Sequence, residues 1–358
     1  MSRLQASQAL NYALETMPEL VAGRRLLWNL TPGTGRTEGA RALCWDRGLA
    51  SGWEEAGLKP EGLPNEPACF PTVLLVPDRQ RECQEAELAR AVRWAGSEGV
   101  AVVSVPNLWG AKRLAKRLQE VRVEEVAAAV TKHHSRVFFL RQNGPWEGSG
   151  LDAWEKGGEM RRQPPLDHWT QPGLFSWDRV DEGSALLADH LPETLAGQVA
   201  DLGCGWGFLS LEVLRRCPAV DSLDAFEADA RALEPARRNL GKVLVPVRPK
   251  LHWADVTAGV GLRRFDQVVM NPPFHEGREA DPSLGLRFIS AAAAALKDEG
   301  SLWMVANRQL PYEPLLEALF GEWRQVAVAR GFKVLHACHP LPSSRPRVAF
   351  RRRKKGRR

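Results

Sequence analysis

Glycines at three alternate positions make Val199 to Gly207 the part of this sequence best suited to chemistry. The segment reads Val-Ala-Asp-Leu-Gly-Cys-Gly-Trp-Gly, an apolar run that ends in an acid and continues into the glycines. Apolar residues at helical spacing follow from Leu209 to Leu214, so the pattern predicts a strand, a tight loop and a helix. The dinucleotide fingerprint requires its third glycine at position 208, where this chain has Phe208. The spacing therefore favours S-adenosylmethionine (AdoMet) over NAD.

A second motif, Asn271-Pro272-Pro273-Phe274, follows an apolar strand pattern at 265–270. One proline would be enough to end a strand, and two stiffen the turn. The Asn271 side-chain oxygen and the Pro272 carbonyl can both accept hydrogen bonds from one substrate NH₂ group, while the Phe274 ring offers a flat face for a base. The lone pair of a nucleobase amine is conjugated with the ring, and two acceptors that favour a pyramidal nitrogen would free it. The motif predicts methyl transfer to an amine without a metal.

These motifs must be positioned by alternating strands and helices. Strands are expected near 198–201, 222–226, 265–270 and 301–305, and a helix is expected from Leu286 to Leu296. Glu227 ends the second of these strands about twenty residues after the glycine loop, where a carboxylate can accept both ribose hydroxyls of a nucleoside. Asp224 and Asp229 are nearby alternatives, but the spacing to the next helix favours Glu227. Asp255 ends a further short strand.

With these motifs in order, the sequence resembles the bacterial tandem-domain rRNA guanine-N2 methyltransferases, which modify RNA of the small or the large ribosomal subunit. The resemblance covers about residues 170 to 340. The segments that carry it are Pro172 to Ser176, Asp181 to Ser184, the glycine loop, Asn271 to Gly277, Val305 to Asn307, Leu310 to Tyr312 and Phe332 to Val334.

The resemblance implies a role for each candidate residue. Glu227 would bind the ribose and Asp255 the adenine amine, while Asn271 and Pro272 would hold the target amine. The residues expected to be catalytic are Asn271, Pro272 and Phe274. Those expected to bind AdoMet are Asp201, Gly203, Gly205, Gly207, Glu227, Asp255 and Asn271.

The first half of the chain contains weak copies of the motifs, which indicates an internal repeat. Leu27 to Gly35 can be laid over Val199 to Gly207; it keeps the second pair of glycines and lacks the acid and the first glycine. Leu74 to Arg79 falls opposite Val269 to Phe274 without the asparagine, the second proline or the aromatic ring. A third match, of Glu98-Gly99 with Glu299-Gly300, follows the other two in the same order along the chain. The repeats suggest a duplicated fold whose first copy has lost its chemistry.

The fold class expected is therefore α/β, with two tandem Rossmann-like class I methyltransferase domains, the first of them degenerate. We expect the degenerate domain, a substrate platform, to span 1–142. Residues 143–170 are rich in Gly, Pro, Trp and charge and are expected to be a linker. The catalytic domain is expected at 171–342 and a basic tail at 343–358.

Composition indicates the compartment and the class of partner expected for these domains. The 358 residues suffice for two cores, and six scattered cysteines without C-x-x-C spacing fit a reducing cytosol, where they are expected to be small buried apolar residues. No signal pattern or membrane-length apolar run is found, so a cytoplasmic protein with neither metal nor membrane partner is expected. The formal net charge is +6, and 345–358 holds nine basic residues and no acid. This tail is expected to bind RNA phosphates.

The function expected is AdoMet-dependent methylation of the N2 amine of a guanine in ribosomal RNA, with 16S favoured over 23S. The expected partner is ribosomal RNA or a ribosomal subunit, and a monomer is favoured. The same motif chemistry serves adenine-N6 and protein glutamine methylation, which remain alternatives. A non-catalytic RNA-binding or ribosome-assembly protein on a methyltransferase fold is the alternative from another class.

Overall fold

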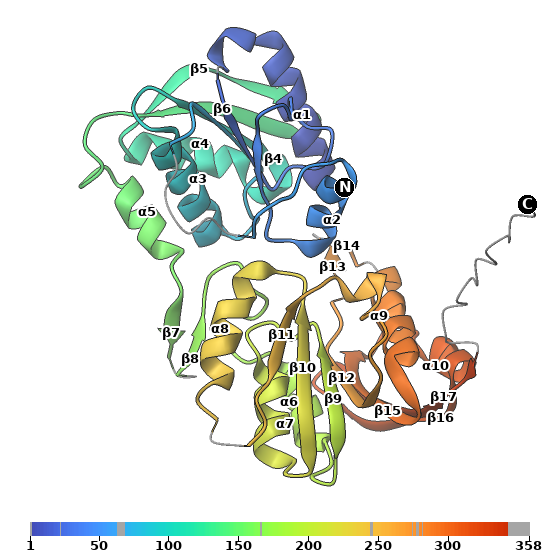
Figure 1. Cartoon of the computed structure of the whole chain (residues 1–358). Helices are drawn as coiled ribbons and strands as arrows, with labels where there is room; N and C mark the ends of the chain where they lie inside the picture. Colours follow the sequence, from blue (N-terminus) through green and yellow to red (C-terminus); the bar gives the residue numbers. More distant parts are fainter. Residues whose placement is uncertain are drawn as a thin grey trace, which may run out of the picture.

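The chain forms two lobes, each built around its own β-sheet (Figure 1). The computed structural model describes residues 2–342 apart from 22, 63–68, 165–166, 244–245, 274, 277–278 and 281. The expected basic tail lies outside the described residues. Within the described part, the two sheets account for the tandem α/β architecture that the sequence predicts.

The first lobe contains a six-stranded sheet in the order β2-β1-β3-β4-β6-β5. The first four strands in this order are parallel, and β6 and β5 add an antiparallel edge. The strands are β1 (Arg25–Trp28), β2 (Arg41–Leu43), β3 (Thr72–Leu75), β4 (Val100–Pro106), β5 (Val123–Lys132) and β6 (Ser135–Gln142). The helices are α1 (Ser2–Thr16), α2 (Arg47–Glu55), α3 (Arg81–Ala95) and α4 (Ala111–Arg117), with short 3-10 turns η1 (Pro18–Leu20), η2 (Asn107–Trp109) and η3 (Leu118–Glu120).

The second lobe contains a seven-stranded sheet in the order β11-β10-β9-β12-β15-β17-β16. Strand β17 runs antiparallel to its two neighbours, β15 and β16, and the other neighbouring pairs in this sheet are parallel. The strands are β9 (Gly197–Leu202), β10 (Val220–Glu227), β11 (Lys250–Trp253), β12 (Phe265–Met270), β15 (Leu296–Asn307), β16 (Phe320–Ala329) and β17 (Phe332–Pro340), with a separate hairpin of β13 (His275–Glu276) and β14 (Glu279–Ala280). The helical elements are α6 (Glu182–His190), α7 (Phe208–Arg216), α8 (Ala230–Leu240), η4 (Val256–Ala258), α9 (Pro282–Ala295) and α10 (Glu313–Leu319).

The two sheets share one topology. The six strands of the first sheet have the same spatial order and directions as β10-β9-β12-β15-β17-β16 of the second. In the place of β11 the first lobe has a single parallel bridge between Leu43 and Glu61. The sequence matches of the repeat pair β1 with β9, β3 with β12 and β4 with β15, which are equivalent strands. The topology therefore supports the hypothesis of a duplication.

Local signals account for the boundaries of several helices. At the start of α3 the Gln80 side chain accepts from the Cys83 N–H at 2.7 Å, and Gly96 ends the helix with φ 74°. The alanine-rich helix α9 also forms as expected, and strand β15 begins directly after it at Leu296.

Residues 143–170 hold one structural element against each lobe. Helix α5 (Leu151–Gly157) packs on α3, where Glu155 binds Arg93 at 2.8 Å. The hairpin of β7 (Arg161–Gln163) and β8 (His168–Thr170) packs on α8, because the Asn239 amide bonds both the N–H and the carbonyl of Trp169 at 2.7 and 2.8 Å. The segment expected to be a linker thus contains regular structure, and its boundaries stay a prediction.

Tryptophan rings pack inside the first core, and most of the cysteines are buried. Trp28 stacks on Trp94 at 4.8 Å and meets Trp45 edge-on at 6.2 Å inside the first core. All six cysteines are free thiols, and four are buried as expected. Cys69 is exposed and Cys338 is only partly buried, so the expectation of burial is wrong at these two positions. Among the described helices, none has the length and apolar composition needed to cross a membrane.

Candidate active site

The predicted site residues gather at one edge of the second sheet. Asp201, Glu227 and Asn271 end or follow β9, β10 and β12, which are neighbours in the sheet, and Asp255 follows β11 at its edge. The carboxyl ends of parallel strands meet at the same edge, which in open α/β sheets is where ligands bind. This edge faces the first lobe (Figure 1).

The glycine loop has a backbone that side chains would disfavour. Gly203, Gly205 and Gly207 have φ of 78°, 54° and 95°, in the left-handed region that glycine enters without strain. The N–H groups of Gly203 and Cys204 donate to the Phe226 carbonyl at 2.9 and 3.0 Å and join the loop to β10. A β-carbon added to Gly205 would meet nothing within 4 Å. The loop therefore presents bare backbone to open space, as cofactor binding requires.

Asp201 lies behind this loop and is fully buried. Its Oδ2 accepts from the Ser210 hydroxyl at 2.6 Å, which fixes the strand against the first turn of α7. Burial raises the pKa of Asp201 to about 6, and the bond from Ser210 partly opposes this rise. Its Oδ1 is buried with no hydrogen-bond partner in the described part of the chain. Direct contact between Asp201 and a cofactor stays a prediction.

Glu227 ties the loop to the next strand. Its Oε2 accepts from the Gly205 N–H at 2.7 Å and its Oε1 accepts from the Asp229 N–H at 2.8 Å. Burial raises the pKa of Glu227 to about 7, against the lowering effect of these backbone donors. Each carboxylate oxygen keeps further lone pairs, so the ionised group can accept two ribose hydroxyls.

Asp255 is held by the turn that follows it. Its Oδ1 caps η4 by accepting from the Thr257 N–H at 2.9 Å and the Thr257 hydroxyl at 2.7 Å. Its Oδ2 points toward the first lobe, where a β-carbon on Gly48 would come within 3.1 Å. Oδ2 is therefore the oxygen suited to accept from an adenine amine.

Asn271 is oriented by two acceptors on α6. Its Nδ2 donates to the Asp181 carboxylate and to the Ser184 hydroxyl, both at 2.8 Å. Both amide hydrogens are therefore used, and the side-chain oxygen is left to accept from a substrate. Pro272 is buried and has no N–H, whereas Phe274 lies outside the described residues.

The role of these two anchors is absent from the sequence predictions. Asp181 also caps α6 by accepting from the Ser184 N–H at 2.8 Å, so one carboxylate serves both the helix and Asn271. The spacing of an Asp and a Ser three residues apart signals such a cap. It gives no sign of the contact with Asn271, which lies far along the chain.

Lys333 anchors the remaining side of this region. It is almost fully buried on β17, and its Nζ donates to the Leu310 carbonyl at 2.6 Å and pairs with Glu313. The segment between β15 and α10 is thereby fixed beside the Asn271 strand. Lys333 has no free face toward a ligand, so its role is structural.

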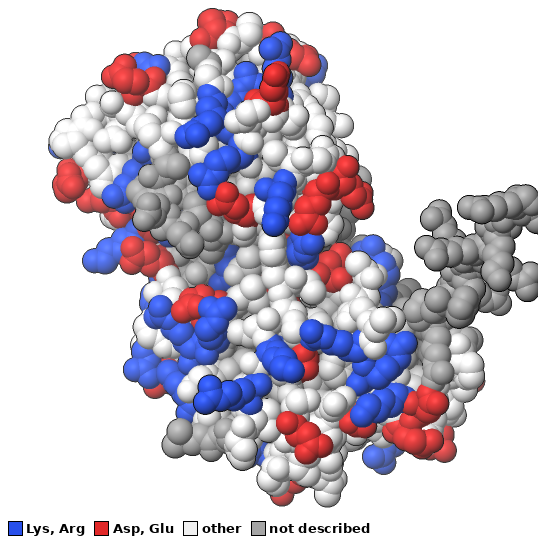
Figure 2. All heavy atoms as spheres, viewed as in Figure 1, with Lys and Arg blue, Asp and Glu red and all other residues white. Residues whose placement is uncertain are grey.

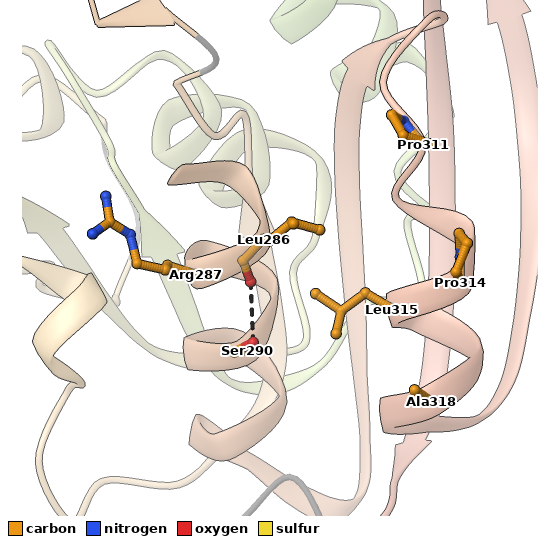
Figure 3. Close-up of a pocket in the computed structure, with 7 residues that line it drawn as sticks. All are labelled: Leu286, Arg287, Ser290, Pro311, Pro314, Leu315 and Ala318. Carbon is orange, nitrogen blue, oxygen red and sulfur yellow. Dashed lines mark hydrogen bonds between the residues drawn. The ribbon is translucent and has the colours of Figure 1, made fainter. Parts of the chain in front are cut away.

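A groove between α9 and α10 is separate from the predicted site residues (Figure 3). Its volume is about 450 Å³, and its lining is mostly apolar. The lining residues are Leu286, Arg287, Ser290, Pro311, Pro314, Leu315 and Ala318. Among the described residues, none that is predicted to bind cofactor or to be catalytic lines this groove.

Comparisons with known proteins show which family the chain resembles. The family model described as methyltransferase small domain matches residues 166–336. Ribosomal RNA small subunit methyltransferase C of Acinetobacter baumannii is 30% identical over 235 residues, which cover 64% of this chain and 67% of the relative. The protein of the same name from Stutzerimonas stutzeri is 29% identical over 89% of this chain and 96% of its own length.

A solved structure extends the agreement to both lobes. The T. thermophilus 16S rRNA N2 methyltransferase in complex with AdoMet and guanosine superposes with a TM-score of 0.74 and 25% identity. The match covers 93% of this chain and 91% of that protein.

Proposed function

The chain belongs to the ribosomal RNA small subunit methyltransferase C family, and we propose that it transfers a methyl group from AdoMet to the N2 amine of a guanine in 16S rRNA. AdoMet supplies the methyl group on a positively charged sulfur. The protein's share of the chemistry is to orient the amine, and the single observation that carries the proposal is the fixed side chain of Asn271.

Asn271 suits an amine and not an alcohol. Because its NH₂ group is held by Asp181 and Ser184, the side chain presents only its carbonyl oxygen to the substrate. The Pro272 carbonyl supplies a second acceptor, and two acceptors match the two N–H bonds of one exocyclic amine. This pair stabilises the charge that develops on the nitrogen as it attacks, without a strong base.

The cofactor-binding assignment follows from the same edge of the sheet. Open space over Gly205 suits the close approach of a ligand to backbone, and the bond between Asp201 and Ser210 fixes the strand end behind this loop. Glu227 would hold the ribose and Asp255 the adenine amine. We assign all these residues to AdoMet as a proposal that rests on their placement.

Ribosomal RNA as substrate fits the charge of the second lobe. Lys and Arg side chains lie over much of this lobe on the face shown in Figure 2. Contacts of such side chains with phosphates supply most of the sequence-independent affinity for RNA. The Asn271 and Pro272 acceptors would fit the NH₂ group of an adenine or a glutamine equally well, so the choice of guanine rests on the family to which the chain belongs. The fixed Asn271 side chain favours an enzyme over a non-catalytic assembly protein.

The test is methylation with AdoMet labelled in its methyl group. Purified 30S subunits, free 16S rRNA and 50S subunits would be incubated separately, and the labelled nucleoside would be identified after digestion. We expect N2-methylguanosine in small-subunit RNA, and Asn271→Ala should abolish this transfer in a protein that still binds AdoMet. Label in N6-methyladenosine, or full turnover by Asn271→Ala, would contradict the proposal.

A further inference from the structure

The two lobes meet through equivalent segments. Residues 45–47 follow β2 and contain Asp46, the N-cap of α2; residues 228–230 follow β10 and contain Asp229, the N-cap of α8. Asp46 and Asp229 form an antiparallel bridge, so the repeat pairs with itself across a local pseudo-twofold axis. The bridge is made by the Arg47 N–H to the Ala228 carbonyl at 2.9 Å and by the Ala230 N–H to the Trp45 carbonyl at 2.8 Å.

A buried arginine locks the same junction. Arg231 is 6% exposed and lies over the Trp45 ring at 4.2 Å. Its guanidinium donates to Asp78 at 3.0 Å and to the Cys83 sulfur at 3.0 Å, and it also pairs with Asp229 at 2.6 Å. Asp78, Cys83 and Glu87 would otherwise form a group able to hold a metal ion, but the guanidinium lies against all three.

The first lobe also reaches the outer strand of the cofactor edge. The Trp253 indole N–H donates to the carbonyls of Trp45 at 3.0 Å and Ala228 at 2.9 Å, and Arg47 lies over its ring at 5.1 Å. Gly48, in the first turn of α2, faces Asp255 Oδ2 so closely that any β-carbon would lie 3.1 Å from it. The first lobe is thus in contact with the turn after Glu227 and with Asp255.

We infer that the first lobe is a working part of the AdoMet site: residues 45–48 position the turn that carries Glu227 and form the wall beside Asp255, where only glycine leaves the carboxylate free for adenine. This rests on the proposed function, since it assigns Glu227 and Asp255 to the ribose and the adenine. Residues 45–48 and Arg231 act through other groups and are positioning residues. The first lobe would therefore govern AdoMet affinity through its contacts with the turn after Glu227 and with Asp255.

Gly48→Val in the full chain tests the inference, with AdoMet binding measured by calorimetry. The valine displaces the Asp255 carboxylate, and losing a hydrogen bond to a charged group weakens binding about tenfold or more. The kcat at saturating AdoMet should be retained, because the Asn271 end of the site is untouched. Glu55→Val is the matched control: it lies two turns farther along α2, is exposed and should bind AdoMet normally.

Two further variants separate positioning from loss of folding. Gly48→Ala should give a smaller rise in the AdoMet Kd, and Arg231→Lys should raise it while speeding amide exchange at Gly205 and Asp229, whose N–H groups Glu227 holds. An unchanged Kd in folded Gly48→Val would overturn the inference. Wild-type chain that binds no AdoMet would instead refute the proposed function, so the two failures are distinguishable.

Discussion

The pKa of Glu227 predicts how AdoMet affinity depends on pH. Burial raises this pKa from its ordinary 4.5 to about 7, so the free enzyme holds a carboxyl that titrates near neutrality. Ribose hydroxyls donate hydrogen bonds, and the ionised carboxylate is the better acceptor. AdoMet binding should therefore strengthen as the pH rises through 7.

The size of the effect follows from the titration. With a pKa of about 7, roughly one-tenth of the Glu227 carboxyl is ionised at pH 6 and roughly nine-tenths at pH 8. If the ionised form alone binds, the apparent Kd falls about tenfold between these pH values. The stability of the free enzyme moves the other way, because a carboxyl whose folded pKa is raised stabilises the fold below its ordinary pKa and loses this contribution as the pH rises through the folded value.

The assay is calorimetric titration of AdoMet at several pH values from 6 to 8, with Glu227→Gln as the reference. The glutamine cannot ionise, so this variant should bind AdoMet more weakly, and its Kd should lack the pH dependence that Glu227 causes. Titration of AdoMet itself affects both proteins equally and cancels in the comparison. Asp201, whose pKa is raised to about 6, titrates below most of this window in both proteins. Parallel pH curves for the two proteins would refute the reasoning.

Three other predictions concern the anchor of Asn271, the tail and the number of cofactors. Ser184→Ala removes one of two acceptors for the Asn271 amide and should lower kcat about tenfold with an unchanged AdoMet Kd, which single-turnover kinetics and calorimetry can check. An equal loss of kcat and of AdoMet affinity would argue for a general structural effect. Deleting residues 347–358 should weaken RNA affinity and flatten its dependence on salt; identical binding in a salt titration would contradict the role of the tail. Calorimetry should find one AdoMet per chain, and two would show that the first lobe still binds cofactor.

The sequence predicted the elements of the site better than the contacts between them. The alternating glycines and the helical and strand patterns are local signals, so the loop after β9 and helix α9 formed where expected. The contact of Asn271 with Asp181 joins residues 90 positions apart, and the contact of Arg231 with Asp78 joins residues 153 apart. Each is a single polar pair set by the packing of whole elements, and no local pattern encodes it.

The same limit explains the interpretation of 143–170 as a linker. Its Gly, Pro and charged residues are typical of irregular chain, but Leu151 is fully buried against the first core and Trp169 is bound at both backbone groups by Asn239. Order there comes from surfaces supplied by α3 and α8. Composition alone could not reveal it, because those surfaces belong to other parts of the chain.

The first lobe keeps the topology of a cofactor-binding fold, but residues at the edge equivalent to the site contact the second lobe instead. Gly33 and Gly35 after β1 retain positive φ of 85° and 70°. Cys44 lies two residues before the N-cap of α2, the position at which the second lobe has Glu227 before the N-cap of α8. Burial raises the pKa of the Cys44 thiol to about 12, so this thiol stays neutral. After β3, Asp78 binds Arg231 of the second lobe. The residues at this edge of the first lobe thus contribute to the interface with the second lobe, which explains how a repeat that lacks the Asn-Pro-Pro-Phe motif can remain part of the enzyme.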